Sequence, residues 1–320
     1  MIGIRTPFRV SFTGGSTDLP SFYRKKTGKV ISTSIDKYMY HFIHKFDKEL
    51  IQIKYSETEL VKDPKDIKHK IVKKIAEEND LKGLDINSIA DIPKGSGLGS
   101  SSAYTVGLIN AINVAHGNIL SKEKLAKESA DLEINKLKEP IGKQDHYASA
   151  YGGLNLITFN KDDTVHVESI SIEDQGINYL NSSFILLKVG DTRSASEILS
   201  EQNKSYEDDT NIDLGIKILE LVDPMVSAIR SYNIKEIGEI LNINWNLKNN
   251  LSDSVSNNEI DEFIKDLISI RGVYGAKLLG AGAGGYVLAT GEPNVLNEIR
   301  FENKVSFKLE SNGSTIIFQD

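Results

Sequence analysis

The chain has 320 residues, of which 39% are hydrophobic and 26% charged, and its formal net charge at pH 7 is −7. This length suggests about two domains, and the composition is that of an ordinary globular protein. The acidic balance argues against a nucleic-acid partner, and the absence of cysteine excludes disulfides, a thiolate nucleophile and cysteine-ligated metal centres.

Strand patterns dominate the first third of the chain. Residues 2–12, 29–35, 38–45 and 50–55 are rich in β-branched or alternating apolar side chains, which predicts four strands. A helix is expected over 66–79, because its apolar residues recur at spacings of three and four. A further strand over 84–92 precedes a glycine- and serine-rich segment, and an apolar helix is expected after it, over 101–116.

The rest of the chain alternates between helical and strand patterns. A helix is expected over 121–137, and residues 194–270 are mostly helical by their apolar spacing. The remaining strands are expected at 154–159, 165–172, 184–189, 276–279, 285–289, 305–309 and 315–318. These elements predict a mixed α+β fold with two domains, at residues 1–180 and 181–320.

The segment from Pro93 to Ser102 has the composition of an anion site. A strand, then glycines and small hydroxyl side chains, then a helix directs backbone N–H groups and the positive end of the helix dipole at one point. The alternative is a helix cap after a flexible loop, because serine is a common capping residue. No Gly-Lys-Ser or Gly-Lys-Thr sequence occurs, so a nucleotide bound here would not be held by a Walker A loop.

Two other segments do not indicate a function when each is considered alone. Residues 280–285 match the dinucleotide pattern G-x-G-x-x-G, but a strand pattern follows them where that fold requires a helix. A hairpin that approaches a ligand and a bulged hairpin both fit better than a nicotinamide-binding turn. Near the start, Arg9 lies on a strand and Asp18 after the next turn, where each alone would be a solvated charge or a helix cap.

Together, the three segments resemble the galactokinase, homoserine kinase, mevalonate kinase and phosphomevalonate kinase (GHMP) superfamily over nearly the whole chain. Residues 93–101 are similar to its phosphate-binding signature, and residues 6–18 and 279–285 to its first and third motifs. The resemblance implies two α+β domains with the active site between them. The N-terminal domain would be like domain 2 of ribosomal protein S5, and the C-terminal domain ferredoxin-like.

Within the superfamily, the sugar-1-kinase branch is the most similar. The segments that carry this likeness are 12–20, 142–145, 151–153, 245–248 and 277–285, while His146 stands where that branch commonly has glutamine. The favoured reaction is phosphorylation of the anomeric hydroxyl of D-glycero-D-manno-heptose 7-phosphate, for surface-polysaccharide precursors. The alternatives are a fucokinase or galactokinase type, or a non-catalytic sugar or nucleotide sensor, against which the presence of both Asp145 and Arg9 argues.

The resemblance also implies which residues bind ATP and Mg²⁺. The backbone of the glycine-rich segment would hold the nucleotide phosphates, through Pro93, Gly95, Ser96, Gly97, Leu98, Gly99, Ser100 and Ser101. Ser101 and Glu133 match the magnesium ligands of the family, and both offer the hard oxygen atoms that Mg²⁺ prefers. Asp131 is the alternative carboxylate, because the helix phase is not known from the sequence.

For the chemistry, Asp145 matches the catalytic aspartate that takes the proton of the attacking hydroxyl. Arg9 matches the basic residue beside it, which offsets charge on the transferring phosphoryl group. The sugar-binding residues implied by the resemblance are Gly14, Gly15, Ser16, Thr17, Asp18, Arg193, Gly282 and Gly284.

The expected partner is therefore a small sugar or sugar phosphate, with no nucleic acid and no membrane. No apolar run approaches the roughly 18 residues of a membrane span, and the start lacks the layout of a signal peptide. We expect a cytoplasmic protein, with a monomer and a homodimer both open.

Overall fold

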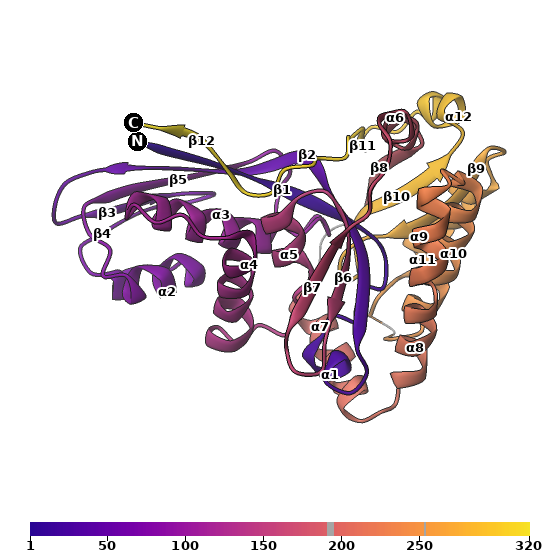
Figure 1. The fold of residues 1–320 in the computed structure, drawn as a ribbon, viewed down its shortest axis with the longest axis horizontal. Helices are drawn as coiled ribbons and strands as arrows, with labels where there is room; N and C mark the ends of the chain where they lie inside the picture. Colours follow the sequence, from indigo (N-terminus) through magenta and orange to yellow (C-terminus); the bar gives the residue numbers. More distant parts are fainter. Residues whose placement is uncertain (191–194, 253) are drawn as a thin grey trace.

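Most of the first of two sheets lies in the long arm of the molecule (Figure 1). The computed structural model describes residues 1–190, 195–252 and 254–320. The strand order is β12-β1-β2-β5-β3-β4, with β6 paired to β2 and β7 to β6. The strands are β1 (Ile2–Thr13), β2 (Gly28–Lys45), β3 (Ile51–Lys54), β4 (Thr58–Val61), β5 (Leu84–Ala90), β6 (Leu154–Phe159), β7 (Val165–Ser169) and β12 (Thr315–Gln319).

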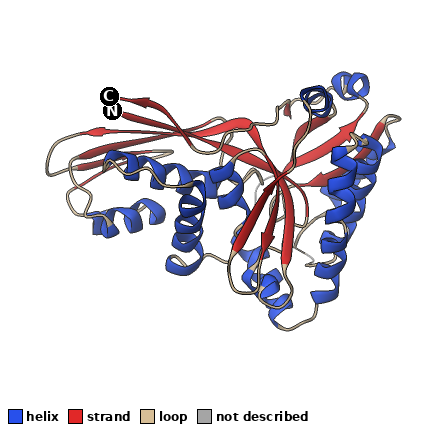
Figure 2. Ribbon diagram, viewed as in Figure 1, coloured by secondary structure: helices blue, strands red, loops and turns tan. Residues whose placement is uncertain are grey.

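Helices cover one side of this sheet (Figure 2). They are α2 (Lys70–Glu78), α3 (Ser100–Ala115), α4 (Lys122–Ala130) with a π-helical continuation (Asp131–Lys136), and α5 (Gln144–Tyr151). Helix α3 is apolar on nearly all sides because it packs against β1, β2, α4 and α5 together. Its first turn therefore has a fixed position beside β1.

The second sheet has the order β11-β8-β10-β9. Its strands are β8 (Phe184–Val189), β9 (Val273–Leu278), β10 (Gly285–Gly291) and β11 (Lys304–Val305). The other helices are α1 (Pro20–Tyr23), α6 (Asp174–Ser182), α7 (Ala195–Glu207), α8 (Ile212–Glu220), α9 (Val222–Arg230), α10 (Ile234–Asn249), α11 (Asn258–Ser269) and α12 (Pro293–Glu298). Helix α10 packs on β9 and β10 and also contacts β1, so one hydrophobic core connects the two sheets.

Most predicted elements are confirmed, with three kinds of difference. The strands expected at 29–35 and 38–45 are one strand, β2, and the helix expected over 121–137 changes to π-helical geometry at Asp131. Helices α1, α5, α6 and α12 and strand β4 were not predicted, and the strand expected at 305–309 is reduced to the two residues of β11. The domain boundary between residues 180 and 181 stays a prediction. Strand β7 belongs to the first sheet and β8 to the second, but the C-terminal strand β12 pairs with β1 in the first sheet. In the described residues, no helix is long and apolar enough to cross a membrane.

Candidate active site

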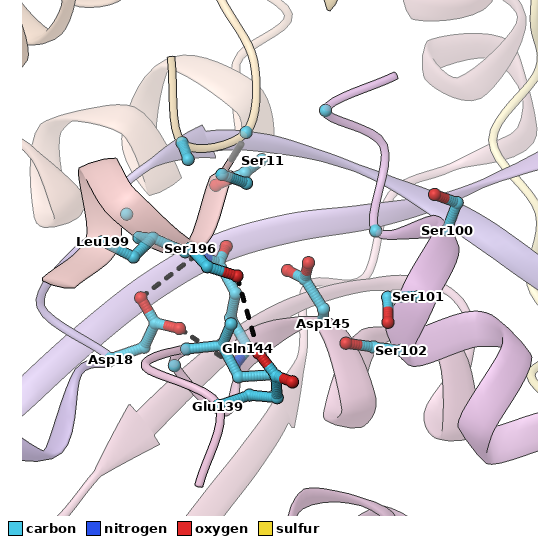
Figure 3. Close-up of a pocket in the computed structure, with 18 of the residues that line it drawn as sticks. Ser11, Asp18, Ser100, Ser101, Ser102, Glu139, Gln144, Asp145, Ser196 and Leu199 are labelled. Atoms are coloured by element: carbon cyan, nitrogen blue, oxygen red, sulfur yellow. Dashed lines mark hydrogen bonds between the residues drawn. The ribbon is translucent and has the colours of Figure 1, made fainter. Parts of the chain in front are cut away.

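A cavity of about 530 Å³ lies where elements of the two sheets meet. Its lining comes from β1, the glycine-rich segment, the first turns of α3 and α5, helix α10 and the segment after β9. In Figure 3, Asp145 lies between Asp18 on one side and the serines at the start of α3 on the other. Five of the residues that the sequence singled out therefore line one cavity although they are distant in the chain: Arg9, Asp18, Ser101, Glu133 and Asp145.

The centre of the cavity is an ion pair between Arg9 on β1 and Asp145 at the start of α5. Arg9 Nε donates to one carboxylate oxygen at 2.7 Å and Nη2 to the other at 2.8 Å. Its Nη1 donates to the carbonyl oxygen of Gly97 at 2.6 Å. Bidentate charge-assisted pairs of this kind are strong and directional. Arg9, which is only 3% exposed, thus joins β1, the glycine-rich segment and α5.

The glycine-rich segment uses left-handed backbone at three positions. Gly95, Gly97 and Gly99 have φ angles of 76°, 77° and 75°, a region that glycine adopts without steric cost. Gly99 is the residue before α3, and no side chain caps that helix. Gly95, Gly97, Gly99, Ser100 and Ser101 line the cavity. Unsatisfied N–H groups at a helix start favour an anion, so this side of the cavity suits a phosphate.

Three of the expected nucleotide-binding residues do not line the cavity. Pro93 is exposed outside it, while Ser96 and Leu98 are buried beneath the segment. The Ser96 hydroxyl accepts from Leu98 N at 3.3 Å, and the Leu98 carbonyl accepts from Arg9 N at 3.0 Å. These residues support the shape of the segment.

The third motif packs backbone to backbone against the glycine-rich segment. Tyr286 N donates to the Ser96 carbonyl at 3.1 Å. A Cβ at Gly280 would lie 2.5 Å from Gly97 Cα, and one at Gly285 would lie 2.7 Å from the Ser96 oxygen. As the sequence predicted, the motif is a turn between two antiparallel strands, β9 and β10. Its glycines permit the close approach of the two backbone segments.

This contact gives a matched pair of variants, Gly97→Ala and Gly117→Ala. Both glycines have nearly the same φ, 77° and 78°, so both variants carry similar backbone strain. A Cβ at Gly97 would lie 2.7 Å from the Leu279 oxygen, whereas one at Gly117 meets nothing within 4 Å. We expect Gly97→Ala to cost about 1–3 kcal/mol more than Gly117→Ala and to weaken nucleotide binding. Thermal unfolding with and without nucleotide measures both effects, and equal losses would contradict the close packing.

Glu133 and Ser101 form the second polar group of the cavity wall. The Ser101 hydroxyl donates to Glu133 Oε2 at 3.1 Å, and His146 Nε2 lies 3.1 Å from Oε1. Burial alone would raise the pKa of Glu133, but the His146 contact and the hydroxyl hydrogen bonds outweigh it and lower that pKa. Asp131 instead accepts from Asn135 at 2.8 Å. The structure therefore brings Glu133, not Asp131, to Ser101.

Asp18 is a buried carboxylate on the other side of the cavity. It is 3% exposed and accepts from Ser16 N, Gln144 N and Gln144 Nε2, each at 3.1 Å. Burial, then repulsion from Asp145, raises its pKa to about 6. It lines the cavity together with Gly15 and Ser16, in a position to accept hydrogen bonds from a polar ligand.

The other expected sugar-binding residues lie elsewhere. Gly14 and Thr17 are behind the wall, where the Thr17 hydroxyl donates to the Gly14 carbonyl at 2.7 Å. Gly282 and Gly284 do not line the cavity, and a Cβ at Gly282 would lie 2.5 Å from the Val255 oxygen. Arg193 lies outside the described residues. The roles of all these residues stay predictions.

Two lysines in the wall were assigned no role from the sequence. Lys277 on β9 donates to the Phe12 carbonyl at 3.0 Å and to Asn244 Oδ1 at 2.7 Å. Lys248 on α10 donates to the Gly280 carbonyl. Both lie in segments that carried the resemblance to sugar kinases. Their burial could not be anticipated, because lysine is almost always exposed unless it is paired.

Comparison with known families decides what kind of protein holds this site. Residues 66–153 match the model of the GHMP kinases N terminal domain, and residues 225–304 match that of the GHMP kinases C terminal. Together the two models cover more than half of the chain. The chain belongs to the GHMP kinase family. Members of this family are ATP-dependent kinases, which makes ATP the expected phosphoryl donor.

Individual relatives of this GHMP kinase are also kinases. It is 29% identical to a D-glycero-alpha-D-manno-heptose 7-phosphate kinase of Campylobacter jejuni, over 94% of each chain. It is 27% identical to a mevalonate kinase of Pyrococcus horikoshii, over 91% of this chain and 81% of the relative. The crystal structure of a D-glycero-D-manno-heptose 1-phosphate kinase from Bacteroides thetaiotaomicron shares its fold, with a TM-score of 0.79 at 20% identity over both whole chains. The protein is thus a phosphotransferase with an alcohol group as acceptor, a sugar kinase of the GHMP type.

Proposed function

We propose that this kinase transfers the γ-phosphoryl group of ATP to the anomeric hydroxyl of D-glycero-D-manno-heptose 7-phosphate. The product would be the 1,7-bisphosphate, a precursor for surface polysaccharide. The observation that carries the proposal is the Arg9–Asp145 pair, which lies between the glycine-rich segment and Asp18. The similarity to a heptose 7-phosphate kinase supports this acceptor. A cytoplasmic location belongs to the same proposal.

In this mechanism, Asp145 accepts the proton of the anomeric hydroxyl while the oxygen attacks the γ-phosphorus. The bond to the bridging oxygen of ADP breaks as the new bond forms. Arg9 fixes both oxygens of Asp145 and offsets negative charge on the transferring group. Asp18 accepts hydrogen bonds from other sugar hydroxyls and so orients the acceptor.

Ser101 and Glu133 would hold the Mg²⁺ that accompanies the nucleotide. Their oxygens are 3.1 Å apart, both residues line the cavity, and Mg²⁺ takes one or two protein oxygens with phosphate and water as further ligands. When bound, the ion would neutralise phosphate charge. The described residues contain no group of three acidic, histidine or cysteine side chains that could hold a metal, so these two oxygens depend on the nucleotide to complete a site.

The proposal is tested by ADP release with ATP and Mg²⁺ across a panel of acceptors. The panel is heptose 7-phosphate, mannose, fucose, galactose and mevalonate. We expect heptose 7-phosphate to give the highest kcat/KM by at least about a hundredfold, since an acceptor that leaves buried polar groups unpaired is strongly rejected. A higher value for fucose or galactose would assign the enzyme to those sugars. Sugar binding without turnover on any acceptor would point to a sensor.

A further inference from the structure

Lys248 and Lys277 place two ammonium groups in the wall of the cavity. The residues are 7% and 4% exposed, and both line the cavity. Their hydrogen-bond acceptors in the described part of the chain are neutral: the carbonyls of Gly280 and Phe12 and the side chain of Asn244. Neither lysine forms an ion pair with a carboxylate of these residues, and the nearest balance is the longer-range attraction between Lys248 and Asp18.

Burying two such charges together is unfavourable without an anion. Burial, then repulsion from Arg9, lowers the pKa of Lys248 to about 8, and attraction to Asp18 opposes this shift without reversing it. Burial, then repulsion from Lys248, lowers the pKa of Lys277 well below its ordinary value. Each ammonium has three donors, and the hydrogen bonds above occupy one at Lys248 and two at Lys277. The remaining donors can be satisfied by an anion in the cavity.

The neighbouring contacts place the lysines on the acceptor side. Lys277 contacts Phe12, from which the chain continues directly into the turn that carries Asp18. Three residues that line the cavity each have a buried polar atom without a partner among the described residues: Ser11 Oγ on β1, Gln144 Oε1 on α5 and Gln202 Nε2 on α7. A hydroxyl and an amide suit sugar hydroxyls, and paired ammonium groups suit a phosphate. The combination matches a ligand that carries both.

We propose that Lys248 and Lys277 form an anion site that receives the phosphate group carried by the acceptor itself. This inference rests on the proposed function and deepens it, because it names the residues by which the enzyme would select a phosphorylated sugar over the free sugar. The γ-phosphate of the nucleotide is the alternative anion for this site. Lys248 contacts Gly280, and Gly280 packs against Gly97 of the glycine-rich segment. The acceptor's phosphate is favoured because Lys277 contacts the strand that leads to Asp18.

The test compares Lys248→Met and Lys277→Met with the wild type in titration calorimetry. Lys235→Met is the control, because Lys235 is an exposed lysine on the same helix as Lys248. The ligands are heptose 7-phosphate, the same heptose without phosphate, inorganic phosphate and a non-hydrolysable ATP analogue. Thermal unfolding confirms that each variant is folded, and Lys248→Gln replaces Lys248→Met if that variant is not.

The wild type and Lys235→Met are expected to bind the phosphorylated sugar about 10- to 100-fold more tightly than the free sugar, which is the usual contribution of hydrogen bonds to a charged group. Lys248→Met and Lys277→Met should lose this preference and keep their affinity for the ATP analogue. Loss of affinity for the analogue with the sugar preference intact would overturn the proposal in favour of the γ-phosphate. An unchanged preference in both variants would also overturn it.

Inorganic phosphate separates this proposal from the choice of sugar. If heptose is the wrong sugar, neither form of it binds, but the anion site predicts that the wild type still binds phosphate and that both variants lose this binding. If phosphate binds the wild type and the two variants equally, the anion site is wrong even where heptose 7-phosphate is turned over.

Discussion

Asp145→Asn is expected to lower kcat by about a thousandfold, the middle of the range for removal of a general base. Asparagine is close to aspartate in size but cannot accept the proton of the attacking hydroxyl. Asp145 does not lie in the glycine-rich segment, so the affinity for the nucleotide should change little. Steady-state kinetics with heptose 7-phosphate, together with calorimetry of an ATP analogue, measure both quantities.

Asp131→Asn is the matched control for this variant. Asp131 is a carboxylate that accepts from Asn135 and does not line the cavity, so its replacement should leave kcat unchanged. If Asp145→Asn keeps wild-type turnover while it binds both substrates, Asp145 is not the base and the mechanism fails.

Arg9→Met is expected to have the second largest effect, because it removes three hydrogen bonds at once. The Asp145 carboxylate would lose both of its bonds to the guanidinium, and the Gly97 carbonyl would lose its partner. Breaking a buried ion pair by removing one member lowers the free energy of unfolding by about 3–5 kcal/mol. Asp145 is partly open to the cavity, with 22% of its side chain exposed, so we expect a loss of stability at the lower end of this range. The kcat should also fall, by about a hundredfold or more.

Arg9→Lys and a double variant test whether Arg9 acts through geometry as well as charge. Lysine keeps the charge but cannot bind both carboxylate oxygens and Gly97 in one plane, so it should give an intermediate kcat. In Arg9→Met with Asp145→Asn, the losses of stability should be smaller than the sum of the single losses, because the two residues contact each other. Additive losses measured by thermal unfolding would contradict the ion pair.

Most strands of the first sheet were predictable because their sequences carry strong local patterns. Strand β2 is an exception, because its pattern did not show that it is one continuous strand. Two strands were expected, with a break near residues 36 and 37. The structure has one strand whose pairing with β1 shifts register between Pro7 and Arg9, opposite that break. The extra residues in β2 are those of a bulge. The interruption in the pattern is real, but it marks an irregularity within one strand.

Helix α5 was not predicted because the contacts that fix it come from far along the chain. It has only eight residues, and short helices are marginal without tertiary packing. Its first N–H group donates to the carboxylate of Asp18, 126 residues earlier. The interior of the helix, at Tyr147, Ala148 and Ala150, is buried in the main core. Neither contact can be inferred from the sequence near residues 144–151.

The candidate site was predictable to the extent that motifs mark it. The positions of Arg9, Asp18, Ser101, Glu133 and Asp145 around one cavity agree with the expectation from the family motifs, although their roles stay predictions. The sequence could not show which of Glu133 and Asp131 faces Ser101, because the helix changes to π-helical geometry after Ala130 and its phase changes there. The two buried lysines needed the packing of α10 on β9, because nothing in their local sequence distinguishes them from exposed lysines.

The position of the new phosphate tests the proposed transfer to the anomeric hydroxyl, and ³¹P NMR after reaction of the wild-type enzyme with ATP and heptose 7-phosphate measures it. We expect a product with two phosphate signals, one that retains the coupling of the 7-phosphate and one that couples to the anomeric proton. A new signal coupled to any other ring proton, or no new sugar phosphate while ATP is still hydrolysed, would contradict it.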